Sequence, residues 1–274
     1  MQAHRLTKTI VLGLIAAGLS LSAQAHNAWL LPNSTMIDSK EAWVSLDAGI
    51  SNQLFEFNHA PLRLDNLMIT DPDGVTTKAE GAVLGKFRST LDLRLPKDGT
   101  YRLSIVNNNV MGSYKLNGET KRFRGAQGSP QVQVPAGATE VQTTQVQTRL
   151  ETFVSANKMN ETALKPSGAG LEMVPVTHPT DLRVGDPIKV RFLIDGKPAA
   201  NLPFSVTPGT AKYRGASGEQ RLTTDAKGEA TFTIAAPNMY WMNASFPGGE
   251  RGAPQQQAPA KRYTYAATFE VLPQ

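Results

Sequence analysis

Three histidines are the residues in this sequence whose chemistry is best suited to binding a metal. They are His26, His59 and His178, while the fourth histidine, His4, lies in an N-terminal segment that we expect to be removed. His26 directly follows Ala23-Gln24-Ala25, the small-x-small cleavage pattern of a secretory signal. Cleavage after Ala25 makes His26 the first residue of the mature chain. A terminal histidine offers a free α-amine and an imidazole, which together can chelate a metal ion.

Imidazole nitrogen is a suitable ligand for zinc, copper, nickel and cobalt, so the divalent ion is expected to be one of these four. Two imidazoles and the α-amine of His26 would form a T-shaped brace of the kind known from copper proteins. Three imidazoles and the amine would form a square or tetrahedral set of four donors. The amine and the rings must lose their protons to bind, so metal binding is expected to weaken as pH falls.

Each histidine also has an ordinary structural interpretation. His26 could be a residue of a disordered terminus, which is common in secreted proteins. His59, in Asn58-His59-Ala60-Pro61, could be a loop residue hydrogen-bonded to the backbone, and His178 could cap a turn. The three histidines are far apart in the sequence, so their spacing leaves open whether they meet.

Residues 1–25 have the three parts of a signal peptide. Arg5 and Lys8 give a positively charged start, and Ile10 to Leu21 is an apolar run that is too short to cross a bilayer. We therefore expect export to the periplasm, and no membrane-embedded segment after cleavage.

Composition excludes several classes of function. The chain has no cysteine, so disulfides, thiolate metal sites and cysteine nucleophiles are absent. Loss of Arg5 and Lys8 lowers the formal net charge from +5 to +3, and without a basic block this gives no reason to expect nucleic-acid binding. The sequence has no glycine-rich phosphate loop, no Gly-x-Ser-x-Gly and no His-Glu-x-x-His, so we do not expect an enzyme.

Short alternating segments predict an all-β fold with two β-sandwich domains. In residues 26–156, strands are expected at 42–48, 62–70 and 100–107, separated by turns such as Asp71-Pro72-Asp73-Gly74. The aspartates of this turn faintly resemble a calcium loop, but the later ligands are missing and a turn is favoured.

Two stretches of the first domain are less regular. Lys121 to Gly128 contains three close cations and glycines and is interpreted as an exposed, solvated loop. Thr139 to Phe153 is extended and polar and is predicted to be a last strand or pair of strands.

Residues 157–170 are predicted to be a linker, because they contain small residues with proline and glycine. The second domain, 171–274, is predicted to be an immunoglobulin-like sandwich of about seven strands. Its clearest signals are the edge strand 171–176, interrupted by Pro175, and the alternating strand 188–194.

Four segments also resemble a known family. They are Ala25-His26-Asn27-Ala28-Trp29-Leu30, then 171–179 (LEMVPVTHP), 185–198 (GDPIKVRFLIDGKP) and 223–232 (TTDAKGEATF). They are similar to a large family of bacterial periplasmic proteins classed as a domain of unknown function, whose members are often labelled as nickel- or cobalt-transport-associated. The resemblance implies a secreted, non-enzymatic protein of metal uptake or handling that works with a membrane metal transporter. Many members carry an acid after the terminal histidine, where this chain has Asn27.

Three hypotheses follow for the function. The first is a periplasmic protein that binds a transition metal for uptake or delivery through His26, His59 and His178. The second is a metal-free β-sandwich module that binds a protein or glycan at the cell envelope. The third is a copper oxidoreductase that uses the brace. The first predicts that blocking the terminal amine destroys metal binding, and the second predicts no stoichiometric metal.

Overall fold

The protein is built from β-strands, as the sequence predicts. The structure, a computed structural model, describes residues 26–126, 128–209, 218–247 and 260–274. The predicted signal peptide, residues 1–25, lies outside the described residues. Within them the chain forms no α-helix, only the short 3-10 helices η1 (Pro130–Val132) and η2 (Thr162–Leu164).

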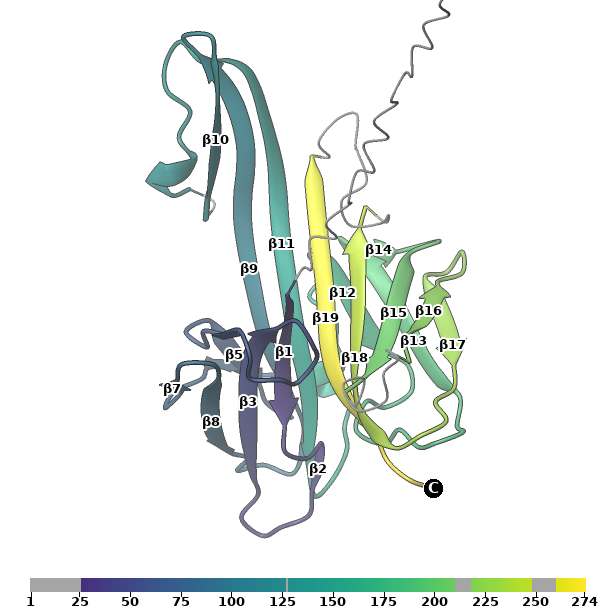
Figure 1. Ribbon diagram of the computed structural model, residues 1–274. Helices are drawn as coiled ribbons and strands as arrows, with labels where there is room; N and C mark the ends of the chain where they lie inside the picture. Colours follow the sequence, from purple (N-terminus) through teal and green to yellow (C-terminus); the bar gives the residue numbers. More distant parts are fainter. Residues whose placement is uncertain (1–25, 127, 210–217, 248–259) are drawn as a thin grey trace, which may run out of the picture.

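The strands form three sheets (Figure 1). The first has the order β1-β3-β8-β7, with β4 also paired to β3; its strands are β1 (Asn27–Pro32), β3 (Trp43–Ser51), β4 (Ala60–Pro61), β7 (Val83–Leu84) and β8 (Ser89–Arg94). The third has the order β12-β13-β14, with β17 paired to β13; its strands are β12 (Leu171–Pro175), β13 (Ile188–Ile194), β14 (Lys197–Pro198) and β17 (Glu229–Phe232).

The second sheet is the largest and contains strands from both halves of the sequence. Its order is β16-β15-β18-β19-β11-β9-β5-β6, with β10 paired to β9 and β2 to β11. Its strands are β2 (Met36–Ile37), β5 (Leu67–Thr70), β6 (Thr76–Lys78), β9 (Gly99–Leu116), β10 (Glu119–Ala126), β11 (Thr139–Ala156), β15 (Pro203–Pro208), β16 (Gln220–Thr223), β18 (Asn238–Phe246) and β19 (Lys261–Val271). Its two halves join where β11 and β19 pair in parallel, from Gln145–Lys261 to Thr152–Thr268.

Strand β11 separates two hydrophobic cores. All residues from Arg149 to Ala156 are buried. Because side chains alternate between the faces of a strand, Leu150 and Val154 pack in the core beneath the first sheet, whereas Phe153 packs in the core beneath the third. Each core therefore lies between two sheets, and the central sheet contributes a wall to both.

The two cores follow the halves of the sequence, with few exceptions. The first-sheet core draws its residues from Trp29 to Ala156 but also includes Trp241 and Ala266 from β18 and β19. The third sheet faces β15, β18 and β19, as the predicted immunoglobulin-like sandwich requires. The domain boundaries at 156 and 171 stay predictions, since one sheet runs through both halves.

The second half matches the sequence pattern closely. Strand β13 covers the predicted 188–194, and it pairs with β14 across Asp195 and Gly196, which adopt φ values of 49° and 77°. Strand β12 ends at Pro175 and lies at the edge of its sheet, where a proline without an amide hydrogen is tolerated.

The predicted loop over Lys121 to Gly128 is wrong, because most of it is the strand β10. Strands β9, β10 and β11 extend together beyond the body of the protein as a three-stranded arm (Figure 1). Phe123 of β10 lies opposite Gly112 of β9. Among the described residues from 107 to 143 none is buried, so this segment carries no core pattern from which a strand could be recognised.

The predicted linker is held by a buried network of charges. Glu172 accepts hydrogen bonds from the backbone N–H groups of Ser167 (2.8 Å) and Gly168 (2.7 Å). Arg149 lies 3.4 Å from Glu172 and 3.2 Å from Glu151, and all three side chains are at most 6% exposed. The Tyr265 hydroxyl donates to Glu151 at 3.0 Å, and burial raises the pKa of Tyr265 well above its ordinary value. The network thus ties β11, β12 and β19 to the segment between the halves.

A cluster of ion pairs on the third sheet makes the free energy of unfolding depend on pH in the acid range. Glu229 is paired with Lys189 (2.6 Å) and with Arg191, and these hydrogen bonds and charges lower its pKa from 4.5 to about 2. The stabilisation is therefore present above pH 4.5 and is lost as pH falls toward 2. We expect Glu229→Gln to be less stable than the parent at pH 7 in urea unfolding, with the difference disappearing near pH 2. A constant difference across this range would contradict the ion-pair assignment.

Candidate metal centre

The structure brings His26 and His59 into direct contact. Their ring centroids are 3.6 Å apart and the ring planes are inclined by only 15°, so the imidazoles are stacked. Both residues are exposed. Although 32 positions separate them in the sequence, they form a pair of accessible nitrogen bases at one end of the first sheet.

The register of β3 explains why these two histidines meet. Asn27, the first residue of β1, pairs with Ser51 at the end of β3. Ala60, the first residue of β4, pairs with Ile50 next to it. Strand β3 therefore has β1 and β4 as neighbours at its C-terminal end, and His26 and His59 immediately precede these two strands.

Trp29 fixes the start of β1 in this position. Its indole is fully buried, and Nε1 donates a hydrogen bond of 2.8 Å to Ser51 Oγ. Gly49 makes room for the ring, because a Cβ atom there would lie 2.5 Å from Trp29 Cζ2. Phe55, from the loop before His59, packs edge-on against the indole at 5.7 Å between centroids. The same side chain thus anchors both the strand after His26 and the loop before His59.

The donor chemistry of the pair limits how a metal can bind. Rings in contact at 3.6 Å leave no space for an ion between their faces, and imidazole binds metals through nitrogen lone pairs in the ring plane. Within the described residues, no group of three or more His, Asp or Glu side chains could hold a metal ion. A third protein donor must come from elsewhere, and the α-amine that cleavage after Ala25 would expose belongs to His26 itself.

The structure places His178 away from this pair, in a network of hydroxyl groups. Its Nε2 lies 3.2 Å from the carbonyl oxygen of Asn160 and 3.1 Å from Thr100 Oγ1, and its Nδ1 lies 3.1 Å from Thr180 Oγ1. The carbonyl can only accept, so we infer that Nε2 carries the proton. Ser155 Oγ bonds to both threonine hydroxyls, at 2.9 and 2.8 Å.

This network gives His178 a structural role that the sequence only suggested as a turn cap. Thr100 and Ser155 belong to β9 and β11, whereas His178 and Thr180 follow β12. Both ring nitrogens already have protein partners. His178 therefore links the two halves, and the structure offers no contact between it and the other two histidines.

Two aspartates considered as ligands in the sequence instead form turns. Asp71 Oδ1 accepts from the backbone N–H groups of Asp73 (3.0 Å) and Val75 (2.9 Å). Lys97 contacts both Asp71 (2.5 Å) and Asp73 (2.7 Å), so the cation that these carboxylates hold is an ammonium group. The turn interpretation of this segment agrees with the structure.

The fold and site define an all-β protein with two accessible histidines at one end of its first sheet. The chain belongs to the family described as a domain of unknown function, DUF4198, whose model matches residues 23–248. No curated protein sequence matches it. In the described part of the chain, no helix is long and apolar enough to cross a membrane.

Two solved structures are similar over most of the chain at low identity. Trypsin-activated alpha-2-macroglobulin from Escherichia coli shares 12% identity, with a TM-score of 0.25; the match covers 89% of this chain and 16% of that one. The D0-D1 domain of intimin shares 11% identity, with a TM-score of 0.21; the match covers 88% of this chain and 96% of that one. The chain thus spans about a sixth of the alpha-2-macroglobulin.

Proposed function

We propose that this is an exported periplasmic protein that binds one divalent transition-metal ion for uptake or delivery. The ligands are the α-amine and imidazole of His26 and the imidazole of His59. One observation carries the proposal: the ring of His59 stacks on the ring of the residue that the predicted cleavage makes N-terminal. The pairing of β1 and β4 with β3 holds the two histidines close together, so each ring needs only to turn one nitrogen toward a common ion.

Three nitrogen donors indicate which metals would bind. Amine and imidazole nitrogens suit copper, nickel, cobalt and zinc, and a given nitrogen site prefers Cu(II) among these ions. The donors must be deprotonated, so affinity falls as the pH is lowered. Asn27 follows the terminal histidine and adds no negative charge beside the metal.

The exposure of the pair favours transfer of the metal over permanent retention. Both rings lie at the surface, so a partner can reach the ion without unfolding of the donor protein. The partner we propose is a membrane metal transporter.

A metal-free interaction module is the second candidate. Trp43, Phe57 and Phe87 are 40–52% exposed, and exposed aromatic side chains are common where proteins bind partners or glycans. This candidate requires no metal at His26 and His59.

Metal content distinguishes the two candidates. Protein purified from the periplasm would first be analysed by mass spectrometry to establish that it begins at His26. It would then be equilibrated with Cu(II), Ni(II), Co(II) or Zn(II), desalted and analysed for metal. We expect one ion per chain at pH 7.5 and substantially less at pH 5. Less than a tenth of an equivalent of every metal, in protein that begins at His26, would favour the metal-free module.

A further inference from the structure

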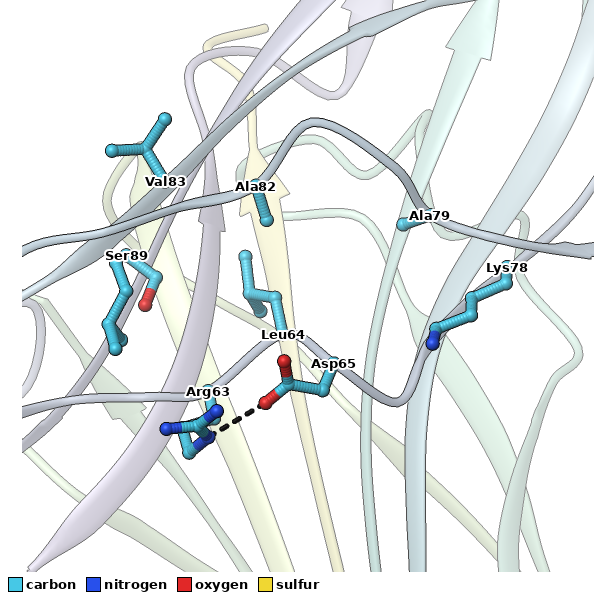
Figure 2. A pocket seen from close by; sticks show the side chains of 9 residues that line it. Arg63, Leu64, Asp65, Lys78, Ala79, Ala82, Val83 and Ser89 are labelled. Atoms are coloured by element: carbon cyan, nitrogen blue, oxygen red, sulfur yellow. Dashed lines mark hydrogen bonds and ion pairs between the residues drawn. The ribbon is translucent and has the colours of Figure 1, made fainter.

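A cavity whose lining includes neither His26 nor His59 lies between the turn before β5 and the segment from β6 to β8. Its volume is about 220 Å³. Figure 2 shows its lining residues, with the charged groups along one side and Ala79, Ala82 and Val83 along the other.

The charged side of the cavity has an excess of one positive charge. Arg63 Nε donates to Asp65 at 2.7 Å, and within the described chain both of its Nη atoms have no hydrogen-bond partner. Lys78 makes no ion pair with a described residue, and Figure 2 shows its side chain directed toward Asp65. Two cations therefore flank one carboxylate, and one more negative charge would balance the group.

The remaining walls combine a buried hydroxyl with exposed apolar groups. Ser89 is only 1% exposed, and its Oγ has no hydrogen-bond partner among the described residues. A buried hydroxyl without a partner is unfavourable. Val83 and Leu84 are 64% and 55% exposed although they are large and apolar. A ligand with a polar atom and a short hydrocarbon body would satisfy the hydroxyl and cover these side chains.

We propose that this cavity binds a small organic acid that carries a second oxygen function. Its carboxylate pairs with Arg63 and Lys78, its hydrocarbon body lies against Val83 and Leu84, and its hydroxyl or carbonyl oxygen bonds to Ser89. A volume of about 220 Å³ suits an acid of a few carbon atoms. None of the lining residues belongs to the proposed metal site, so the acid proposal and the metal proposal can fail separately.

Protein-observed NMR titration tests the site with defined probes. Butyrate, 4-hydroxybutyrate, 2-hydroxybutyrate and butan-1-ol would be added to the mature protein while the resonances of Ala79, Ala82 and Val83 are followed. We expect saturable shifts with the acids, tighter binding of at least one hydroxy acid than of butyrate, and no saturation with the alcohol. No saturable shift with any acid up to about 20 mM, beyond the millimolar affinities of weak ligands, would overturn the proposal.

Variants that remove a charge from the cavity lining should change acid affinity in opposite directions, depending on the sign of the charge, whereas a cation outside the lining should matter little. Lys78→Gln and Arg63→Gln should each weaken acid binding by about tenfold, because each removes a charge-assisted contact. Asp65→Asn should tighten it, since a competing carboxylate is lost. Lys86→Gln is the matched control, as Lys86 is a nearby cation outside the cavity lining.

Two further variants test the walls. Ser89→Ala should remove the preference for a hydroxy acid over butyrate, and Ala82→Leu should weaken all acids by filling the cavity. Equal weakening by Lys86→Gln and Lys78→Gln would show general attraction of anions and contradict the site. His59→Ala should leave the acid titration unchanged, which separates failure of this proposal from failure of the metal site.

Discussion

Replacement of Glu172 by alanine is expected to destabilise the protein by about 3–5 kcal/mol, the range found when one partner of a buried ion pair is removed. The carboxylate accepts hydrogen bonds from Ser167 and Gly168 and lies 3.4 Å from the Arg149 guanidinium. Its loss leaves the N–H groups of Ser167 and Gly168 without this partner, and it removes one of the two carboxylates beside the Arg149 guanidinium, which is only 6% exposed. Urea unfolding followed by circular dichroism measures the change.

The control is Glu161→Ala, an exposed acid in the same connecting segment. A surface substitution of this kind is expected to change stability by no more than about 0.5 kcal/mol. If Glu172→Ala lowered the free energy of unfolding no more than Glu161→Ala does, the claim that this network holds the two halves together would be contradicted. A two-step transition in the variant would in turn indicate that the halves unfold separately once the segment is released.

His59→Ala and His178→Ala are expected to have opposite effects on metal binding and stability. His59→Ala removes a proposed ligand and should weaken Cu(II) binding by more than about 100-fold, beyond the 10- to 100-fold that loss of an outer-shell partner costs. Because His59 is exposed, its loss should change the free energy of unfolding little. Calorimetry and urea unfolding of the same samples measure both quantities.

His178→Ala should leave metal affinity unchanged and cost about 1–3 kcal/mol of stability, since Thr100 and Thr180 lose hydrogen-bond partners. The placement of His178 in the hydroxyl network would be contradicted by loss of metal binding in this variant. Unchanged metal binding in His59→Ala would remove His59 from the ligand set and leave its stacking on His26 without a functional explanation.

The parts of the fold that could be predicted are those with local signals. Strand β13 alternates strictly, and the turn that follows needs positive φ at Asp195 and Gly196, which aspartate and glycine tolerate. Within the arm, the loop prediction fails at β10, which has no apolar residues alternating against a core. Its strand structure comes from a hairpin with β9 across Asn117 and Gly118, whose φ values of 54° and 80° fit the two-residue turn that an Asn-Gly pair favours.

The shared central sheet also could not be predicted from the sequence. Thr139 to Phe153 is extended, as its pattern indicates, but its parallel pairing with Lys261 to Thr268 joins segments more than 100 residues apart. The burial of Arg149 to Ala156 in β11 follows from this pairing and from cores on both faces. The sequence pattern shows the strand but not its neighbours.

The candidate site was predictable as a choice of residues but not as a contact. His26 is singled out by its place after Ala25, whereas its contact with His59 depends on the register of β1 and β4 along β3. His178 has the same side chain but different surroundings, set by Thr100, Ser155 and Thr180. The burial of Glu172 and Arg149 cannot be predicted from the sequence, because nothing local distinguishes a buried charge from an exposed one.

Calorimetry on two forms of the protein tests the central claim most directly. One form begins at His26, and the other carries a single additional residue before it, so that the α-amine of His26 becomes part of a peptide bond. We expect tight one-to-one binding of Cu(II) by the first form, with Ni(II), Co(II) and Zn(II) for comparison, and loss of that binding in the second. Equal binding by both forms would contradict the terminal chelate, and no binding by either would leave the metal-free module as the better account.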